Sequence, residues 1–161
     1  MYRNSEDYSD PVAGEVMSKL MREYKQKQRQ LYRKNSEIKS RPMVYIVSKY
    51  AGDIERNTAA AIDFARFAIQ QNRIPIASHL LYPQILDDGD AEQRELGLLF
   101  GQALLALCKE VWVFGTEHSP GMQAEIHEAR RLNRFMQDPE NAKKFEEWKK
   151  QRQRDGSTPK K

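Results

Sequence analysis

Hydrophobic positions along the chain form two kinds of pattern. Three short, nearly continuous apolar runs predict strands that are buried on both faces, at 43–48, 74–77 and 111–115. Three longer stretches carry apolar residues three and four positions apart and predict amphipathic helices, over 54–71, 91–108 and 122–133. Strands and helices therefore alternate along the middle of the chain.

This alternation is typical of a parallel sheet with helices on both faces. With right-handed crossovers it predicts an α/β fold, a three-layer Rossmann-like sandwich built on a small parallel sheet. If the first strand lies between the other two, the loops that follow Ser48 and Gly115 meet at one crevice. Open sheets of this kind bind ligands at such a crevice, so we expect the functional site there.

The pattern divides the chain into a helical N-terminal extension (1–42), the α/β domain (43–137) and a C-terminal helix with a basic tail (138–161). The sequence Asp10-Pro11 is a typical helix start, and we expect a helix over 11–36. An apolar stripe marks the first half of this helix: Val12, Val16, Leu20 and Tyr24. Such a stripe requires a partner, either the chain's own core or another subunit.

The end of the chain is less regular. Phe135-Met136 could open a last short strand, and beyond Pro139 the spacing of Phe145 and Trp148 indicates a final amphipathic helix. The composition of 151–161 is typical of disorder.

Composition excludes several classes of protein. The chain has 161 residues and one cysteine, Cys108, which excludes a disulfide framework within the chain and a cysteine-rich zinc site. A single cysteine also favours a reducing, cytoplasmic setting. No apolar run approaches the roughly 18 residues of a membrane span, and the N-terminus shows no signal peptide, so we expect no membrane partner.

Charge is distributed unevenly around a total of +4. Residues 1–42 hold 10 basic and 6 acidic side chains (net +4), 43–137 hold 9 and 12 (net −3), and 138–161 hold 8 and 5 (net +3). A basic chain can indicate nucleic-acid binding. Because residues 43–137 are acidic and both terminal segments mix the two signs of charge, nucleic acid is only weakly supported as a partner.

The segment Ser119-Pro120-Gly121-Met122 turns the chain into the helix that carries Glu125. The exposed N–H groups there, together with the Ser119 hydroxyl, would suit a phosphate, and Glu125 falls about one turn into the helix. The alternative to a phosphate site is purely structural: Ser119 caps the helix, and Glu125 merely interacts favourably with the helix dipole.

Other candidates follow the first two strands. Gly52 permits close approach of a ligand, and Asp53 would either hold a sugar hydroxyl or cap the next helix. His79 is either a ligand contact or a structural histidine, and the acidic cluster around Asp88 lacks the spacing of a calcium loop.

Several motifs together resemble the small domains grouped with nucleoside 2-deoxyribosyltransferases. They are Tyr45 to Asp53, His79 to Gln84 with Asp87-Asp88, Arg94 to Gly97, Trp112 to Gly115, and Ser119 to Glu125. The resemblance covers about 43–133. A serine at 119, with Gly121 and Glu125 after it, is also similar to the 2'-deoxynucleoside 5'-phosphate N-hydrolases, whereas the transferases carry an aspartate at that place.

The resemblance implies an enzyme that cleaves or exchanges the N-glycosidic bond of a 2'-deoxynucleoside or its 5'-monophosphate. Glu125 would be the nucleophile, as in a retaining glycosidase, and no metal or organic cofactor would be needed. The residues that it implies are catalytic Glu125, Asp53 and Tyr50, and substrate- or phosphate-binding Ser48, Gly52, His79, Asp88, Gly115, Ser119, Gly121 and Met122. Asp53 and Tyr50 would hold the sugar and Glu125.

A non-catalytic nucleotide-binding or assembly protein is the alternative. Departures from the family include Lys49 in place of proline and the long terminal helices. Both the resemblance and the stripe on 11–36 favour a homo-oligomer with the N-terminal helix as a contact.

Overall fold

The computed structural model describes residues 11–134 and 139–155, and the chain divides into two units, residues 1–41 and 42–161. The first unit contains one helix, α1 (Pro11–Lys39), which runs three residues further than the spacing predicts. Its end lies just before Arg41-Pro42, where a proline without an N–H cannot continue a helix. The stripe residues of α1 are exposed, from 54 % at Val16 and Leu20 to 71 % at Val12.

The second unit is built on three parallel strands, β1 (Met43–Val47), β2 (Ile74–Ile76) and β3 (Glu110–Val113). Their order in the sheet is β2-β1-β3, with Tyr45 opposite Ile76 on one side and Val111 on the other. The predicted parallel sheet with its first strand in the centre is therefore confirmed.

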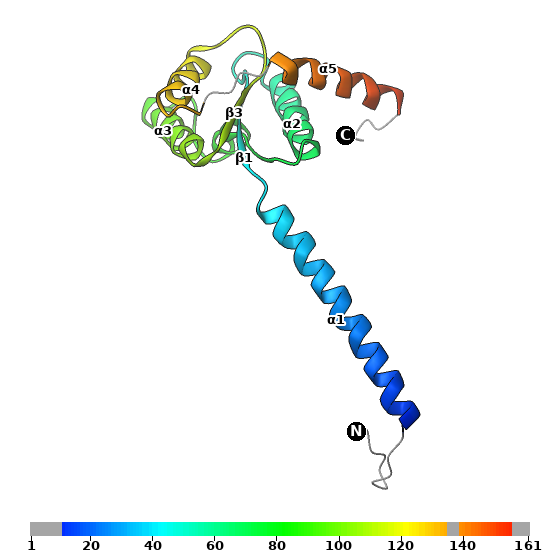
Figure 1. The fold of residues 1–161 in the computed structure, drawn as a ribbon. Coiled ribbons are helices and arrows are strands. Elements are labelled where there is room, and N and C mark those ends of the chain that lie inside the picture. Colours follow the sequence, from blue (N-terminus) through cyan, green and yellow to red (C-terminus); the bar gives the residue numbers. More distant parts are fainter. Residues whose placement is uncertain (1–10, 135–138, 156–161) are drawn as a thin grey trace. The chain divides into compact units, whose positions relative to one another are not determined.

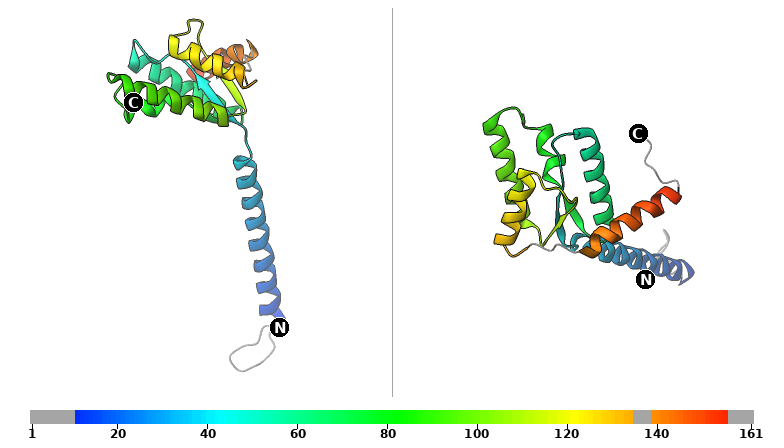
Figure 2. Two further views of the ribbon diagram at one scale, coloured as in Figure 1. Left: turned by 90° about the vertical axis from the view of Figure 1, so that its left-hand side faces the viewer. Right: turned by 90° about the horizontal axis from the view of Figure 1, so that it is seen from above.

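Helices cover both faces of this sheet (Figures 1 and 2). Helices α2 (Ile54–Gln70) and α5 (Pro139–Arg154) lie on one face, and α3 (Ala91–Leu107) and α4 (Pro120–Arg131) lie on the other. Two short 3-10 helices, η1 (Ser78–Leu80) and η2 (Tyr82–Gln84), connect β2 to α3. The α/β sandwich expected from the alternation is thus the observed architecture.

The central strand supplies side chains to both layers. Successive residues of a strand point to opposite faces, so Val44 and Ile46 pack with α2 and α5, while Tyr45 and Val47 pack with residues of α3 and α4. All four side chains are fully buried. This alternation places the one polar group of β1, the Tyr45 hydroxyl, on the α3–α4 side.

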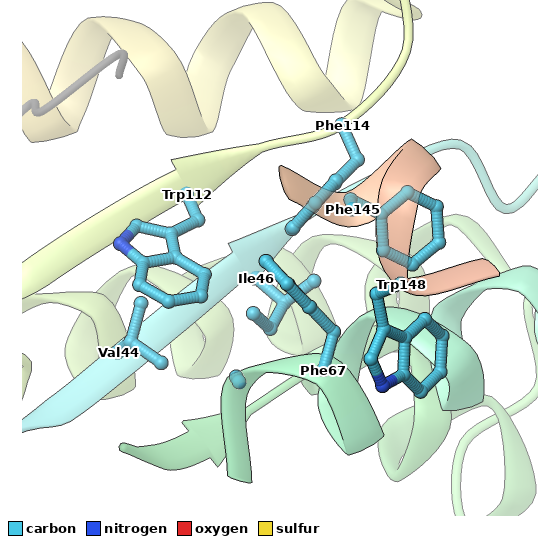
Figure 3. Packing of buried hydrophobic residues seen from close by; sticks show 8 residues of the cluster. Val44, Ile46, Phe67, Trp112, Phe114, Phe145 and Trp148 are labelled. Atoms are coloured by element: carbon cyan, nitrogen blue, oxygen red, sulfur yellow. The ribbon is translucent and has the colours of Figure 1, made fainter. Parts of the chain in front are cut away.

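Helix α5 completes the core on the α2 side (Figure 3). Phe145 and Trp148 are buried there, and their rings lie 5.5 and 6.0 Å from the ring of Phe67. The Trp148 indole also donates a hydrogen bond to Gln70 of α2. The aromatic pair therefore belongs to the domain core.

The end of the chain differs from the sequence-based expectation. The disorder expected over 151–161 is wrong for residues 151–154, because α5 continues to Arg154 and Arg152 pairs with Asp63 of α2. Residues 156–161 lie outside the described residues. The short strand expected at Phe135-Met136 lies outside the described residues. No helix among those that the structure describes is long and apolar enough to cross a membrane.

Candidate functional site

The site lies where β1, β2 and α4 bring polar side chains together beside α3. A cavity of about 480 Å³ opens there, which is within the usual range for small-molecule sites. Eight of the expected site residues line it: Ser48, Tyr50, His79, Asp88, Ser119, Gly121, Met122 and Glu125. The cavity therefore lies at the carboxyl edge of the sheet, where the crevice was predicted.

Glu125 is part of the lining of this cavity. Its Oε1 accepts a hydrogen bond from the Tyr45 hydroxyl at 2.6 Å and a longer one from Ser78 Oγ at 3.5 Å. Among the described residues, Oε2 accepts no hydrogen bond, so that oxygen is the one available to a ligand. The carboxyl group is therefore fixed through one oxygen and free at the other.

Burial dominates the electrostatics of Glu125. Loss of solvent raises its pKa from 4.5 to about 7, although the hydrogen bonds from Tyr45 and Ser78 act in the opposite direction. Burial and the neighbouring carboxylate also raise the pKa of Tyr45 far above its ordinary value, so its hydroxyl stays a donor. A desolvated carboxylate that titrates near neutrality is typical of a catalytic group.

Ser78 links these groups. Its Oγ lies 2.6 Å from the Tyr45 oxygen. Because Tyr45 has a single proton, which it donates to an ionised Glu125, the short bond between Ser78 and Tyr45 is donated by the Ser78 hydroxyl, which shares the same proton with Glu125 Oε1 at the longer distance. Gly101 of α3 makes room for this arrangement, since a Cβ there would lie 3.0 Å from Tyr45 Oη and 3.2 Å from Ser78 Oγ.

His79 also lines the cavity, as a neutral imidazole. Burial lowers its pKa from 6.5 to about 4, and its Nε2 lies 2.9 Å from the Ser48 hydroxyl. The ring of Tyr50 lies 6.4 Å from that of His79. His79 can therefore exchange a hydrogen bond with a ligand at neutral pH but supplies no positive charge.

The amino end of α4 forms another wall. Ser119 caps this helix by accepting a hydrogen bond from Met122 N at 3.4 Å, and Pro120 occupies the first turn. This is the capping interpretation of Ser119, but the same residue also faces the cavity. The cap and a ligand contact are compatible, because a hydroxyl that accepts one bond can donate another.

Three expected site residues lie outside the lining of the cavity. Asp53 caps α2 by accepting from Arg56 N at 3.1 Å, which is the alternative that its position left open. Gly52 and Gly115 have φ angles of +97° and +98°, a conformation in which glycine is strongly preferred. The turns at these two positions therefore account for the two glycines. Tyr50 does line the cavity, but the tyrosine that contacts Glu125 is Tyr45.

The acidic loop before α3 is also accounted for by local structure. Asp87 accepts from Gly89 N, and Asp90 caps α3 by accepting from Glu92 N and Gln93 N. Within 11–134 and 139–155, no group of three or more His, Cys, Asp or Glu side chains is arranged to hold a metal ion.

Tyr45 and Ser78 are functional candidates that the sequence pattern does not single out. A tyrosine inside an apolar strand is easily taken for core, and Ser78 looks like the polar end of β2. One signal was available for Tyr45, because a buried tyrosine hydroxyl requires a hydrogen-bond partner.

Comparison with known proteins gives one family. The family described as Domain of unknown function (DUF7768) matches residues 42–138, which is more than half of the chain. No curated protein matches, and no solved structure matches.

Proposed function

We propose that this chain, which belongs to the family of unknown function DUF7768, cleaves the N-glycosidic bond of a 2'-deoxynucleoside or its 5'-monophosphate, by hydrolysis or by base exchange. The observation that carries the proposal is the state of Glu125, a largely desolvated carboxyl in the lining of a cavity, with one oxygen held by Tyr45 and the other free. The resemblance to the deoxyribosyltransferase group supports the same assignment.

The chemistry follows the logic of a retaining glycosidase. Glu125 Oε2 attacks the anomeric carbon, the bond from that carbon to the base nitrogen breaks, and the electron pair leaves with the base, which takes up a proton. The glycosyl ester is then opened by water, which gives the free sugar, or by a second base. No metal or organic cofactor is required for either step.

The cavity offers suitable surroundings for such a substrate. Tyr82, Leu86 and Leu98 give it an apolar wall against which a flat base can pack. Ser119 and the N–H of Gly121 lie at the amino end of α4, where an anionic group is favoured. Arg94 is a cation in the lining, and its guanidinium bonds the carbonyl of Asp88.

The decisive experiment is incubation of the protein with a panel of deoxynucleosides and deoxynucleoside monophosphates, followed by chromatography for released base. Addition of a second free base to each reaction separates hydrolysis from exchange. Release of base from at least one substrate is expected. If no member of the panel releases base while some member binds, the enzymatic proposal is rejected.

A nucleotide-binding or assembly module is the second candidate. The observation in its favour is the exposed apolar stripe of α1, which a small hydrolase does not need. Binding of a nucleotide without base release, measured by calorimetry on the same panel, would favour this candidate.

A further inference from the structure

The outward face of α3 is unusual for a surface helix. Five of its side chains that face away from the sheet are apolar and exposed, and they recur at helical spacing: Leu96, Leu99, Phe100, Ala103 and Leu107. Their exposed fractions include 54 % at Leu99 and 67 % at Leu107. We call this set the α3 stripe.

The other side of α3 is apolar as well. Leu105 and Gly101 are buried against β1 and the residues around it, and Leu98 lines the cavity. A helix that is hydrophobic on all sides is normally buried on all sides. Helix α2, on the other face of the sheet, also exposes apolar side chains, at Ile54, Ile62 and Ile69. Its exposed residues include charged ones, whereas between Leu96 and Leu107 the one polar side chain of α3 is Gln102.

Charge at the two ends of the α3 stripe indicates what covers it. Glu92 and Glu95 are exposed near the start of α3, and Lys109 is exposed just after its end. Arg94, between the two glutamates, is exposed as well, and its guanidinium is bonded to the carbonyl of Asp88. Two α3 helices packed antiparallel would bring the glutamates of each copy next to Lys109 of the other. The same arrangement sets Leu96 against Leu107 and sets Phe100 beside the small Ala103, where a bulky ring fits.

We propose that the α3 stripe is the surface on which a second copy of this chain docks, through antiparallel pairing of two α3 helices about a two-fold axis. A two-fold contact must be self-complementary, and the acidic start and basic end of one helix meet that requirement. The contact also removes from water an apolar patch that a soluble monomer rarely exposes. This inference is independent of whether Glu125 is catalytic.

Ala103 gives a sharp test because it is exposed and lies close to the expected axis. Both Ala103→Glu and Ala103→Lys keep a good helix former at a solvent-facing position, so each monomer should fold. Sedimentation of the full chain at tens of micromolar should show a dimer for the parent and a monomer for each variant. An equimolar mixture of the two variants should dimerise again, because glutamate then lies near lysine across the axis.

Helix α1 supplies the comparison, since its exposed stripe is another apolar face on which a second copy could dock. Leu20→Glu in α1 should leave the dimer unchanged. A monomeric parent, an Ala103→Glu variant that remains dimeric, or a mixture of the two Ala103 variants that stays monomeric would each overturn the proposal. Dissociation by Leu20→Glu would also overturn it, because α1 of another copy would then be the occupant.

Discussion

The Tyr45 hydroxyl donates a hydrogen bond of 2.6 Å to Glu125, across the gap between the central strand and helix α4. The two residues are 80 positions apart in the chain, and they meet because strand alternation points Tyr45 toward α4. This bond fixes one carboxyl oxygen and leaves the other at the cavity. The chemical predictions below depend on this relationship.

Replacement of the proposed nucleophile is the first prediction. Glu125→Gln keeps the size of the side chain but substitutes a carboxamide, which is a far poorer nucleophile, so base release should fall by several orders of magnitude. The rate of base release, measured under single-turnover conditions, checks this. Circular dichroism and urea unfolding of the same variant show whether the fold is intact. A rate within about threefold of the parent would be incompatible with covalent catalysis by Glu125.

Loss of the Tyr45 hydroxyl should change the titration of Glu125. The hydrogen bond from Tyr45 lowers the pKa of Glu125, so Tyr45→Phe should raise that pKa above about 7. The acidic limb of the rate profile should move to higher pH, because a larger share of the carboxyl is then protonated. Titration of carbon-13-labelled glutamate by NMR checks the shift without any substrate. Ser78→Ala should move the pKa in the same direction.

Stability should depend on pH through two opposing groups. The pKa of Glu125 is raised from 4.5 to about 7, so the folded state binds more protons than the unfolded state and stability falls as pH rises through that window. The pKa of His79 is lowered from 6.5 to about 4, so stability rises with pH between those values. In the parent, the two effects largely cancel between pH 4.5 and 6.5.

Replacing either Glu125 or His79 should expose the pH dependence of stability that the other residue causes. With about 1.4 kcal/mol per pKa unit, each group accounts for about 3 kcal/mol over its window. Glu125→Gln should therefore lose stability steeply as pH falls from 6.5 toward 4, while His79→Asn should lose stability as pH rises from 4.5 to 7. Urea unfolding at several pH values measures both slopes. Identical slopes for the two variants would contradict the assignment.

Gly101 should tolerate no side chain. In a helix interior, alanine is favoured over glycine by about 1 kcal/mol. At Gly101, however, a Cβ would lie 3.0 Å from Tyr45 Oη, so Gly101→Ala should destabilise the fold by about 1–3 kcal/mol. Gly97→Ala in the same helix is the control, because its Cβ would meet the flexible end of Leu86 at 3.4 Å and Tyr82 Cβ at an ordinary contact distance of 3.9 Å. Urea unfolding should show that this control is neutral or stabilising.

Helix α5 should be essential for stability. Trp148→Ala removes a buried ring that contacts Phe67 and Phe145, and it should cost about 3–5 kcal/mol of unfolding free energy. Glu147→Ala, at an exposed position of the same helix, should change stability by less than about 0.5 kcal/mol. Equal effects of the two substitutions would show that α5 does not contribute to the core.

The elements of the fold could be predicted from hydrophobic pattern because the sheet is buried on both faces. The runs at 43–48 and 111–115 are apolar without alternation, which is the pattern of a central parallel strand. The final helix was also visible in the spacing of Phe145 and Trp148. Its packing partner was not, because long-range contacts leave no trace in local spacing.

The site was predicted only in part. Glu125 and Ser119 could be placed because a Ser-Pro-Gly turn before a helix has a local signature. Tyr45 and Ser78 could not, since their roles arise from tertiary contacts with a carboxyl group far along the chain. Asp53 shows a different limit of the sequence. An aspartate before a helix can be a cap or a ligand contact, and the tertiary structure, in which Asp53 caps α2 and lies outside the cavity lining, decides between these two roles.

The packing of α5 has a consequence for synthesis of the protein. The core cluster of Ile46, Phe67 and Phe114 is closed by Phe145 and Trp148, which leave the ribosome last among these residues. Until they emerge, the nascent chain presents an aromatic surface to solvent or to chaperones. Translation that stops before Pro139 would therefore yield a product with this aromatic cluster partly uncovered, a natural target for quality-control proteases.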